Sequence, residues 1–380
     1  MQHCCPGMNT MRSAETWLHE VEPLVRSPLT PLLLFVPLGL VIAHAAPGTN
    51  PLLIFCLNGL AIVPLSNVIS KAVEAICEHL GDQWGGCVNA TAGNLVDMVI
   101  AIAALTGGLN DIVLDSLIGA LITNLLLVLG ISIVLGGLRH SSIKLRPQNT
   151  LLNSNLLLAV MLVVFVPSAL HHGSMFKTPT HHFQFSVVMS FALLTFYLLS
   201  YAYQFFTHKS LFILRTNPLI EDSEHRSAPG LAPSLLVLLI TTIALIFNSE
   251  ALVQGLSAAA EQLKLSPFFT GVFLLPVFGS ASEFYISIRA ALQKRADLAI
   301  ATTVGSSIQV MLFVLPALVI IGWLTGHQLM VFFSPEAMVC VIATVFCIKW
   351  VTEDNNFNWF EGIFLLLIYV LLVCSSFFLL

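Results

Sequence analysis

Charged residues are scarce in this chain of 380 residues. Asp, Glu, Lys and Arg together make up 9% of it and hydrophobic residues 57%, whereas a soluble domain carries about 25% charged residues. So little charge cannot cover the surface of a soluble protein of this size, which excludes an ordinary cytosolic enzyme. Apolar runs of about 18 or more residues recur instead, and they predict an all-α polytopic membrane protein.

Other chemical signatures are missing as well. No cluster of Lys and Arg offers a surface to nucleic acid, and none of the eight cysteines pairs with another at a metal-ligand spacing. The chain has no glycine-rich nucleotide loop, no zinc-binding helix motif and no nucleophile–base pair. We therefore expect no nucleic-acid partner, no resident cofactor, no ATP-driven transport and no intramembrane catalysis.

Eleven apolar segments, separated by turn and charge signals, are predicted to cross the bilayer. Their approximate bounds are 29–46, 51–69, 88–106, 112–136, 151–170, 183–206, 233–254, 268–290, 298–324, 332–351 and 360–379. Residues 1–27 are polar, so no cleavable signal peptide is expected before the first span. The lipid bilayer is thus the expected surrounding, and the sequence does not indicate an oligomeric state.

Lys and Arg fall almost entirely on one side of this arrangement. With the N-terminus in the cytoplasm, 13 of the 15 basic residues lie on the cytoplasmic side, and only Lys177 and Lys264 lie outside. Because cytoplasmic loops carry the excess of Lys and Arg, we predict a cytoplasmic N-terminus and an outer C-terminus. A bacterial inner membrane is the expected host; in an organelle, the outer side would be the lumen.

The longest polar connection lies in the middle of the chain. Five predicted spans lie between residue 51 and this connection, and five follow it, so the two halves cross the membrane in opposite directions, as in inverted-repeat transporters. The first span is then an extra helix. The expected plan is a cytoplasmic N-terminal segment at 1–28, the extra helix at 29–50, a first repeat at 51–206, a cytoplasmic linker at 207–232 and a second repeat at 233–380.

Two spans interrupt their apolar pattern in the same way. The third carries Gly93 and, four positions later, Asp97; the eighth carries Gly279 and, four positions later, Glu283. The two motifs are 186 positions apart and hold equivalent places in the two halves. A charged side chain at the centre of a span costs about 2.5–3.5 kcal/mol, so intramembrane acids are functional by default.

Glycine and small neighbours let helices approach closely or unwind locally. The carbonyls freed in this way, beside a carboxylate, form an oxygen-rich site that suits a hard cation such as Ca²⁺. We therefore interpret Asp97 and Glu283 as a shared cation site, with Asn94 and Ser280 beside them. The alternative is that both acids are neutral and only hydrogen-bond neighbouring helices.

The following span in each half carries a second polar pair. Asn124 and Gln309 are 185 positions apart, and Ser306 precedes the latter. These side chains either act as cation ligands or gate residues, or they form hydrogen bonds between helices. Glu74 and Glu250, also in related positions, either guide ions along an access path or are solvated acids at helix ends.

Two further groups have plainer interpretations. Asp111 and Asp115 stand at the start of a predicted helix, where acids favour the positive end of the helix dipole. Four histidines, at 171, 172, 181 and 182, crowd a predicted outer loop and either collect a transition metal or are solvated.

Together these motifs resemble the cation/proton exchangers of the calcium/cation antiporter superfamily, and among them the Ca²⁺/H⁺ exchangers of bacteria, fungi and plants. The resemblance runs from about residue 30 to the end of the chain. It is carried by Gly85-Gly86, Asn89-Ala90-Thr91, Gly93-Asn94, Asp97, Asn124 to Gly130, Gly136-Gly137-Leu138-Arg139, Gly279 to Glu283, Asp297-Leu298-Ala299-Ile300, Gly305-Ser306-Ser307-Ile308-Gln309 and Asn358-Trp359-Phe360-Glu361-Gly362.

The resemblance implies eleven spans in two inverted halves and the exchange of one cytosolic Ca²⁺ for protons. It makes Asp97 and Glu283 the central carboxylates, and Glu74 and Glu250 acids of the access paths. The surrounding residues would be Asn94, Asn124, Ser280, Ser306 and Gln309.

Three positions depart from the pattern of these exchangers. Leu95-Val96-Asp97 replaces Ala-Thr-Glu, Glu283-Phe284 replaces Glu-His, and Ser66-Asn67 replaces a more acidic pair. These changes concern ion choice and proton coupling, not the fold.

The predicted function is therefore secondary antiport of cytosolic Ca²⁺, or a similar divalent cation, against H⁺ by alternating access. Two alternatives stay open. One keeps the fold and changes the ions, to Na⁺-coupled exchange or the export of Mn²⁺ or another cation. The other is a membrane protein that binds a cation without transporting it.

Overall fold

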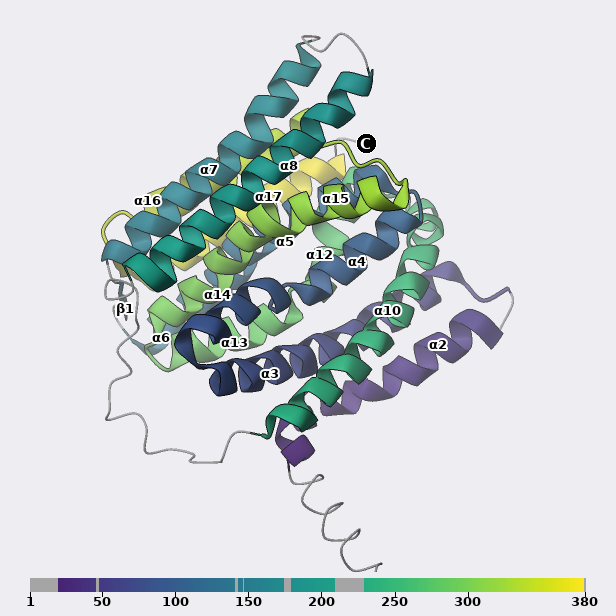
Figure 1. The fold of residues 1–380 in the computed structure, drawn as a ribbon, viewed down its shortest axis with the longest axis horizontal. Helices are drawn as coiled ribbons and strands as arrows, with labels where there is room; N and C mark the ends of the chain where they lie inside the picture. Colours follow the sequence, from purple (N-terminus) through teal and green to yellow (C-terminus); the bar gives the residue numbers. More distant parts are fainter. Residues whose placement is uncertain are drawn as a thin grey trace, which may run out of the picture.

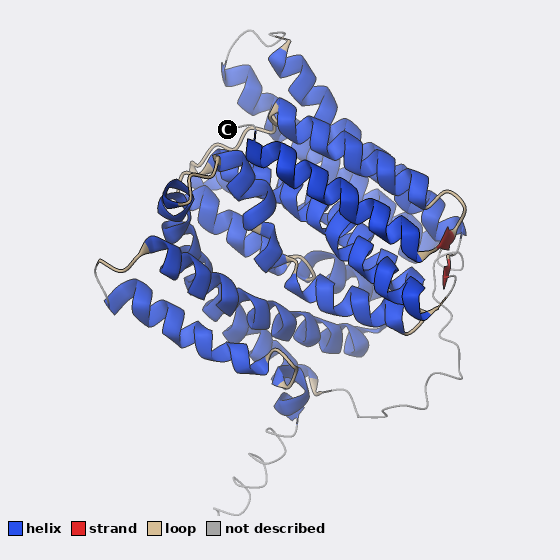
Figure 2. Ribbon diagram, turned by 180° about the vertical axis from the view of Figure 1, so that it is seen from behind, coloured by secondary structure: helices blue, strands red, loops and turns tan. Residues whose placement is uncertain are grey.

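The computed structural model describes residues 20–45, 48–140, 143–145, 147–173, 179–208 and 229–378. Within these ranges the chain is almost wholly helical (Figures 1 and 2). Two strands, β1 (Ile143–Lys144) and β2 (Asn356–Phe357), pair antiparallel at one edge. Most of the predicted linker 207–232, and most of the predicted N-terminal segment 1–28, lie outside the described residues.

The helical elements follow one another with short connections. Those of the first half are η1 (Thr30–Leu34), α2 (Phe35–Ala45), α3 (Pro51–Ala92), α4 (Leu95–Thr106), α5 (Asn110–Ile122), η2 (Thr123–Val128), α6 (Leu129–Arg139), α7 (Pro147–His172), α8 (Pro179–Ala202) and η3 (Tyr203–Thr207). Those of the second half are α10 (Leu231–Gln262), α11 (Pro267–Phe269), η5 (Thr270–Leu274), α12 (Pro276–Gly279), α13 (Ala281–Leu292), α14 (Ala296–Gln309), η6 (Val310–Val314), α15 (Leu315–Thr325), α16 (Pro335–Val351) and α17 (Trp359–Phe378).

The helices confirm the fold class. Seven segments of the described chain are long and apolar enough to cross a membrane, and the pair Pro267–Gly279 and Ala281–Leu292, bent by 61°, forms an eighth. The shorter apolar helices Thr30–His44 and Leu95–Thr106, together with the 17-residue α16, occupy the remaining predicted spans. The chain is an all-α, integral, multi-pass membrane protein.

The second span is longer than predicted. Instead of ending near residue 69, its helix continues to Gly81, whose positive φ of 73° breaks α3 there. Glycine adopts this left-handed backbone without steric cost. The remainder of α3 then leads into α4, so the third span consists of two short helices. As a result Glu74, expected after the second span, lies within a helix.

The helices are arranged in two outer groups, and the broken helices that carry the two motifs lie between these groups. In Figure 1, α2, α3 and α10 lie on one side, α7, α8 and α16 lie on the other, and α4, α12 and α13 lie between. The core is built where the two halves meet, since Leu121 and Leu125 of the first half are fully buried in one cluster with Val310 and Met311 of the second.

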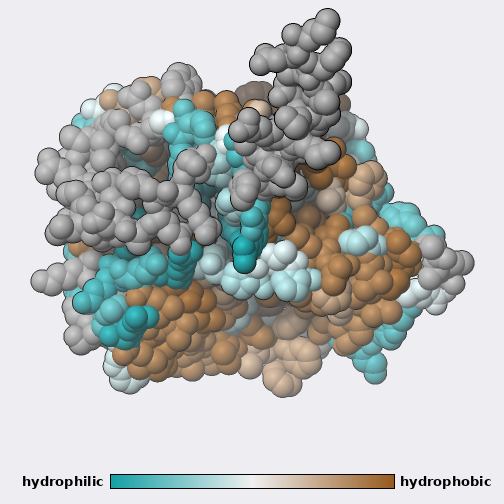
Figure 3. Space-filling view, turned by 90° about the horizontal axis from the view of Figure 1, so that it is seen from below, coloured by the Kyte–Doolittle hydropathy of each residue, from teal (hydrophilic) through white to brown (hydrophobic). Residues whose placement is uncertain are grey.

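Apolar side chains also cover the outside. On α10, Leu235, Leu239, Ile243 and Phe247 recur every four residues and are all exposed, which places them in a stripe along one helix face. Figure 3 shows broad hydrophobic areas on the molecular surface. In water such areas would mark a binding surface; on this chain they face lipid.

Candidate cation site

Both motif-bearing spans are broken at the motif. Asn94, between α3 and α4, and Ser280, between α12 and α13, depart from helical backbone geometry. Asp97 and Glu283 therefore stand in the first turns of two new helices, each at the third position after the break. Free N–H groups and the positive end of the helix dipole stabilise negative charge there.

The packing brings the two motifs together. Gly279, at the second break, lies against the carboxylate of Asp97, and a Cβ at this glycine would clash with Asp97 Oδ1. The carboxyl groups of Asp97 and Glu283 are close enough for their charges to interact. Only a glycine permits this approach, which explains why one precedes the second acid.

Glu283 is buried and held by two serines. Its Oε2 accepts a hydrogen bond from Ser282 Oγ at 2.8 Å, and its Oε1 lies 3.5 Å from Ser306 Oγ. The hydroxyl of Ser306 also lies 2.8 Å from Asn94 Oδ1. One hydroxyl hydrogen serves one acceptor at a time, so the shorter bond to Asn94 leaves Glu283 Oε1 weakly bonded.

Amide side chains complete a network that joins the two halves. Asn94 Nδ2 donates to Gln309 Oε1 at 2.5 Å, and Asn124 Nδ2 donates to Ser306 Oγ at 3.4 Å. All of the predicted surrounding residues except Ser280 thus hydrogen-bond within this cluster. In this arrangement both amide oxygens already accept a hydrogen bond, Gln309 Oε1 from Asn94 Nδ2 and Asn94 Oδ1 from Ser306 Oγ.

Among the predicted site residues, Asn124 Oδ1 and Ser280 Oγ are buried without a hydrogen bond to any described residue. A buried polar atom without a partner is costly, and carboxylate, amide and hydroxyl oxygens are what a hard cation binds. Among the described residues no group of three or more His, Cys, Asp or Glu side chains could hold a metal ion. A bound cation would therefore rely on the two carboxylates together with neutral oxygens.

Matched π-helical turns lie at the second polar pair, one containing Asn124 and one directly after Gln309. η2 begins at Thr123, beside Asn124, and η6 begins at Val310, directly after Gln309. Single π turns inside α-helices concentrate at functional sites. Sequence periodicity did not indicate these turns, because one extra residue per turn changes the apolar pattern very little.

The predicted access acids lie away from this cluster. Glu74 on α3 and Glu250 on α10 are both exposed, and the hydrogen bond given for Glu250 is a long one from Gln254 Nε2, at 3.5 Å. Among the described residues, no hydrogen bond joins either of them to Asp97 or Glu283. Their role in ion access stays a prediction.

The position of Asp115 differs from the one expected from the sequence, because this acid is buried. Asp111 is exposed in the first turn of α5, but Asp115 is only 8% exposed and packs against Gly271. The next residue, Ser116, lines with Asp97 a cavity of about 10 Å³, close to the lower limit for one water molecule. The apolar residues around Asp115 were the signal that it lies inside the membrane.

A second group of polar residues was also missed. Asn58, Ser66 and Asn67 on α3, and Asn248 and Ser249 on α10, are buried, and each has a side-chain oxygen that lacks a partner in the described part of the chain. These two helices pack along each other. In the sequence, Ser66-Asn67 is distinguished only as a departure from the pattern of the exchangers.

The four loop histidines are partly brought together. The rings of His171 and His182 lie 4.8 Å apart, and those of His171 and His172 lie 5.4 Å apart. His171 stacks on Phe332 with ring centroids 4.4 Å apart. This packing is aromatic, in agreement with the absence of a metal-binding group in the described chain.

Paired carboxylates at matched breaks in two central helices define a class of protein, the membrane cation transporters built from broken helices. The sodium/calcium exchanger protein family matches this chain over residues 50–206 and 233–378. The chain belongs to this family.

Individual relatives align over nearly the whole chain. The Ca²⁺/H⁺ antiporter of Synechocystis sp. is 34% identical over 359 residues, which cover 91% of this chain and 96% of the relative. The Ca²⁺/H⁺ antiporter of Aphanothece halophytica is 33% identical over 357 residues, covering 91% and 95%. The solved structure of native YfkE superposes with a TM-score of 0.78 at 26% identity, over 93% of this chain and 100% of that one.

Proposed function

We propose that this chain is a secondary antiporter, not an enzyme, and that it exchanges cytosolic Ca²⁺ or a similar divalent cation for H⁺. The observation that carries the proposal is the meeting of Asp97 and Glu283 at matched helix breaks, among amide and hydroxyl oxygens of both halves. The naming of the relatives from Synechocystis and Aphanothece as Ca²⁺/H⁺ antiporters supports the choice of ions. No resident cofactor is part of the proposal.

The exchange follows from competition for the two carboxylates. When both are deprotonated they balance the charge of one divalent cation, and when the cation leaves, up to two protons take its place. Metal ligands of this kind must lose their protons to bind, so cation affinity and proton occupancy are linked. Within the membrane, two deprotonated carboxylates without a cation are unfavourable, and so is a site that holds the cation and both protons at once.

Alternating access requires two halves that move against each other. The matched breaks, the matched π turns and the separate family matches at 50–206 and 233–378 support the two inverted repeats, with residues 29–50 as an extra helix. The bias of Lys and Arg supports a cytoplasmic N-terminus and an outer C-terminus. The host membrane of the proposal is a bacterial inner membrane.

The test is cation uptake into proteoliposomes with an imposed pH gradient, comparing Ca²⁺, Mn²⁺ and Na⁺. We expect Ca²⁺ uptake that a protonophore collapses, and its loss in Asp97→Asn and in Glu283→Gln. Asp111→Asn, which neutralises an exposed acid outside the cluster, is the matched control and should transport normally. Uptake that needs a Na⁺ gradient, or no flux of any cation, would contradict the proposal.

A further inference from the structure

A large cavity lies beside α13 and separate from the carboxylate pair. Its volume is about 1190 Å³, above the roughly 300–1,000 Å³ of ordinary small-molecule pockets. The lining residues of α13 recur every three or four positions from Ala281 to Leu292, which is one helix face, and Glu283 is not among them. Among the described residues, no acidic side chain lines the cavity.

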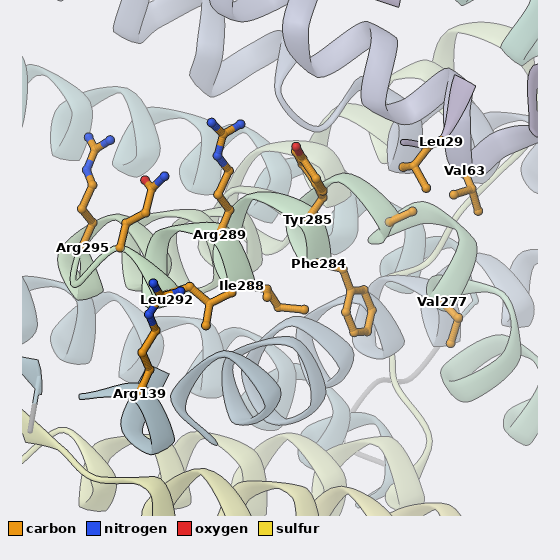
Figure 4. Close-up of a pocket in the computed structure, with 12 residues that line it drawn as sticks. Leu29, Val63, Arg139, Val277, Phe284, Tyr285, Ile288, Arg289, Leu292 and Arg295 are labelled. Atoms are coloured by element: carbon orange, nitrogen blue, oxygen red, sulfur yellow. The ribbon is translucent and has the colours of Figure 1, made fainter. Parts of the chain in front are cut away.

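The two ends of this cavity differ in chemistry. Arg139, Arg289 and Arg295 gather at one end, whereas Leu29 and Val63 lie at the other (Figure 4). Apolar side chains, including Phe284 and Ile288, occupy the space between the two ends (Figure 4). The cavity is therefore amphiphilic along its length.

The three arginines have no acidic partner in direct contact among the described residues. In the described part of the chain the one ion pair is Arg26–Glu22, so none of the three guanidinium groups is neutralised by direct contact. Glu74 is near enough to feel the charges of Arg289 and Arg295, but Lys71 lies beside it and adds a positive charge. A cation on its way to Asp97 and Glu283 would meet repulsion here, which argues against this cavity as its route.

The length of the cavity matches one leaflet of a bilayer. From Ala281 to Leu292, α13 rises about 16 Å, close to half of a hydrocarbon core of about 30 Å. Arg139 and Arg289 come from the loop-side ends of α6 and α13, where headgroups lie. Basic pockets between transmembrane helices bind anionic headgroups, and guanidinium groups bind phosphate through paired hydrogen bonds.

We propose that this cavity binds one anionic phospholipid. Its phosphate lies between the guanidinium groups of Arg139, Arg289 and Arg295, and an acyl chain runs along Ile288 and Phe284 toward Val63 and Leu29. Helix-end arginines can also reach the headgroups of bulk lipid independently of one another; the proposal differs in requiring all three in a single site. It concerns binding and does not rest on the proposed transport function.

The test is a lipid titration of the purified full chain in detergent, followed by native mass spectrometry and by the midpoint of thermal unfolding. Phosphatidylglycerol should bind and raise the midpoint, and phosphatidylcholine with the same acyl chains should not. Arg139→Gln/Arg289→Gln/Arg295→Gln should weaken phosphatidylglycerol binding about 100-fold, at about five-fold for each basic residue. The matched triple change Lys264→Gln/Lys294→Gln/Lys349→Gln, at exposed residues that do not line the cavity, should alter it less than two-fold.

Further measurements distinguish a bound phospholipid from other occupants of the cavity. Ile288→Gln should weaken lipid binding about five-fold if an acyl chain lies in the cavity, and inorganic phosphate at millimolar concentration should give no thermal shift. If the triple arginine variant does not fold, Arg139→Gln and Arg289→Gln alone should each cost about five-fold.

Four results would overturn the proposal. They are equal binding of phosphatidylcholine, an unchanged affinity in the arginine variants, a full thermal shift with inorganic phosphate, and a tight site that appears only after Glu221→Gln/Asp222→Asn/Glu224→Gln. The last result would identify the acidic linker as the occupant.

Discussion

The two broken-helix motifs hold equivalent places in the two halves, yet their acids have different surroundings. Glu283 is buried and faces two serine hydroxyls. Asp97 has no side-chain hydrogen bond to a described residue and lies against Gly279 and a cavity of about 10 Å³. Glu283 is therefore positioned by two serines of its own half, and Asp97 is positioned by the packing of the opposite half. The difference indicates that the pair depends on the contact between the halves.

The largest effect should come from closing the space that Asp97 occupies. Gly279→Ala would place a Cβ against Asp97 Oδ1, and this acid and its helix would have to move. We expect Ca²⁺ uptake to fall about 100-fold or more, since a displacement of about 1 Å can cost two orders of magnitude. Gly305→Ala is the matched control, because a Cβ there meets no atom within 4 Å; equal losses in the two variants would refute this role of Gly279.

The pH dependence of Ca²⁺ binding should distinguish the acids next. Below the pH at which both carboxylates are deprotonated, two protons compete with each Ca²⁺, so the apparent Kd should rise with a limiting slope of about 100-fold per pH unit decrease. In Asp97→Asn one proton competes, and the slope should fall to about ten-fold. Equilibrium dialysis of ⁴⁵Ca²⁺ from pH 5 to pH 9 measures this, and an unchanged slope would remove Asp97 from the exchange.

Substitutions of two serines should distinguish hydrogen bonds within one half from hydrogen bonds between the halves. Ser306→Ala removes a hydroxyl shared by Asn94, Asn124 and Glu283, whereas Ser282→Ala removes one that bonds to Glu283. With about 1.5–3 kcal/mol for a hydrogen bond to a charged group, Ser282→Ala should weaken Ca²⁺ binding about ten-fold. Ser306→Ala should weaken it more, and the reverse order in the same dialysis experiment would contradict this interpretation of the network.

The smallest effect is expected at the access acids. Glu74→Gln and Glu250→Gln leave the carboxylate pair intact, and both side chains are exposed, so Ca²⁺ affinity should change less than two-fold. Uptake rates should fall a few-fold at low salt and recover at high salt, because exposed charges act over about 10 Å at 0.1 M salt. Salt-independent rates would leave both acids as solvated helix ends.

The sequence predicted the fold, which the structure confirms, and it selected the two motifs that the structure brings together. Apolar length predicts the spans, and the repeated spacing of Gly and an acid identified Gly93 with Asp97 and Gly279 with Glu283. These features are visible because each is local or repeated. The breaks follow from the same residues, since Asn94 and Ser280 stand where both helices restart.

The rest depends on contacts that spacing does not encode. The bond between Asn94 and Gln309 joins residues 215 positions apart, and only the packing of the halves shows that these amides bond to each other. The burial of Asp115 was missed because a helix-start rule fits its position in sequence, while η5, packed against α5, covers it. The extension of α3 beyond residue 69 depends on Gly81, which ends the helix later than the apolar run does.

The most direct test of the central claim is the number of protons released for each Ca²⁺ bound. It is measured by calorimetry of the purified protein in buffers that differ in ionisation enthalpy. Near the acidic end of the binding range the account predicts a value approaching two for the native chain, and approaching one for Asp97→Asn and for Glu283→Gln. Binding of Ca²⁺ without proton release in the native chain would show that the two ions do not share this pair of carboxylates.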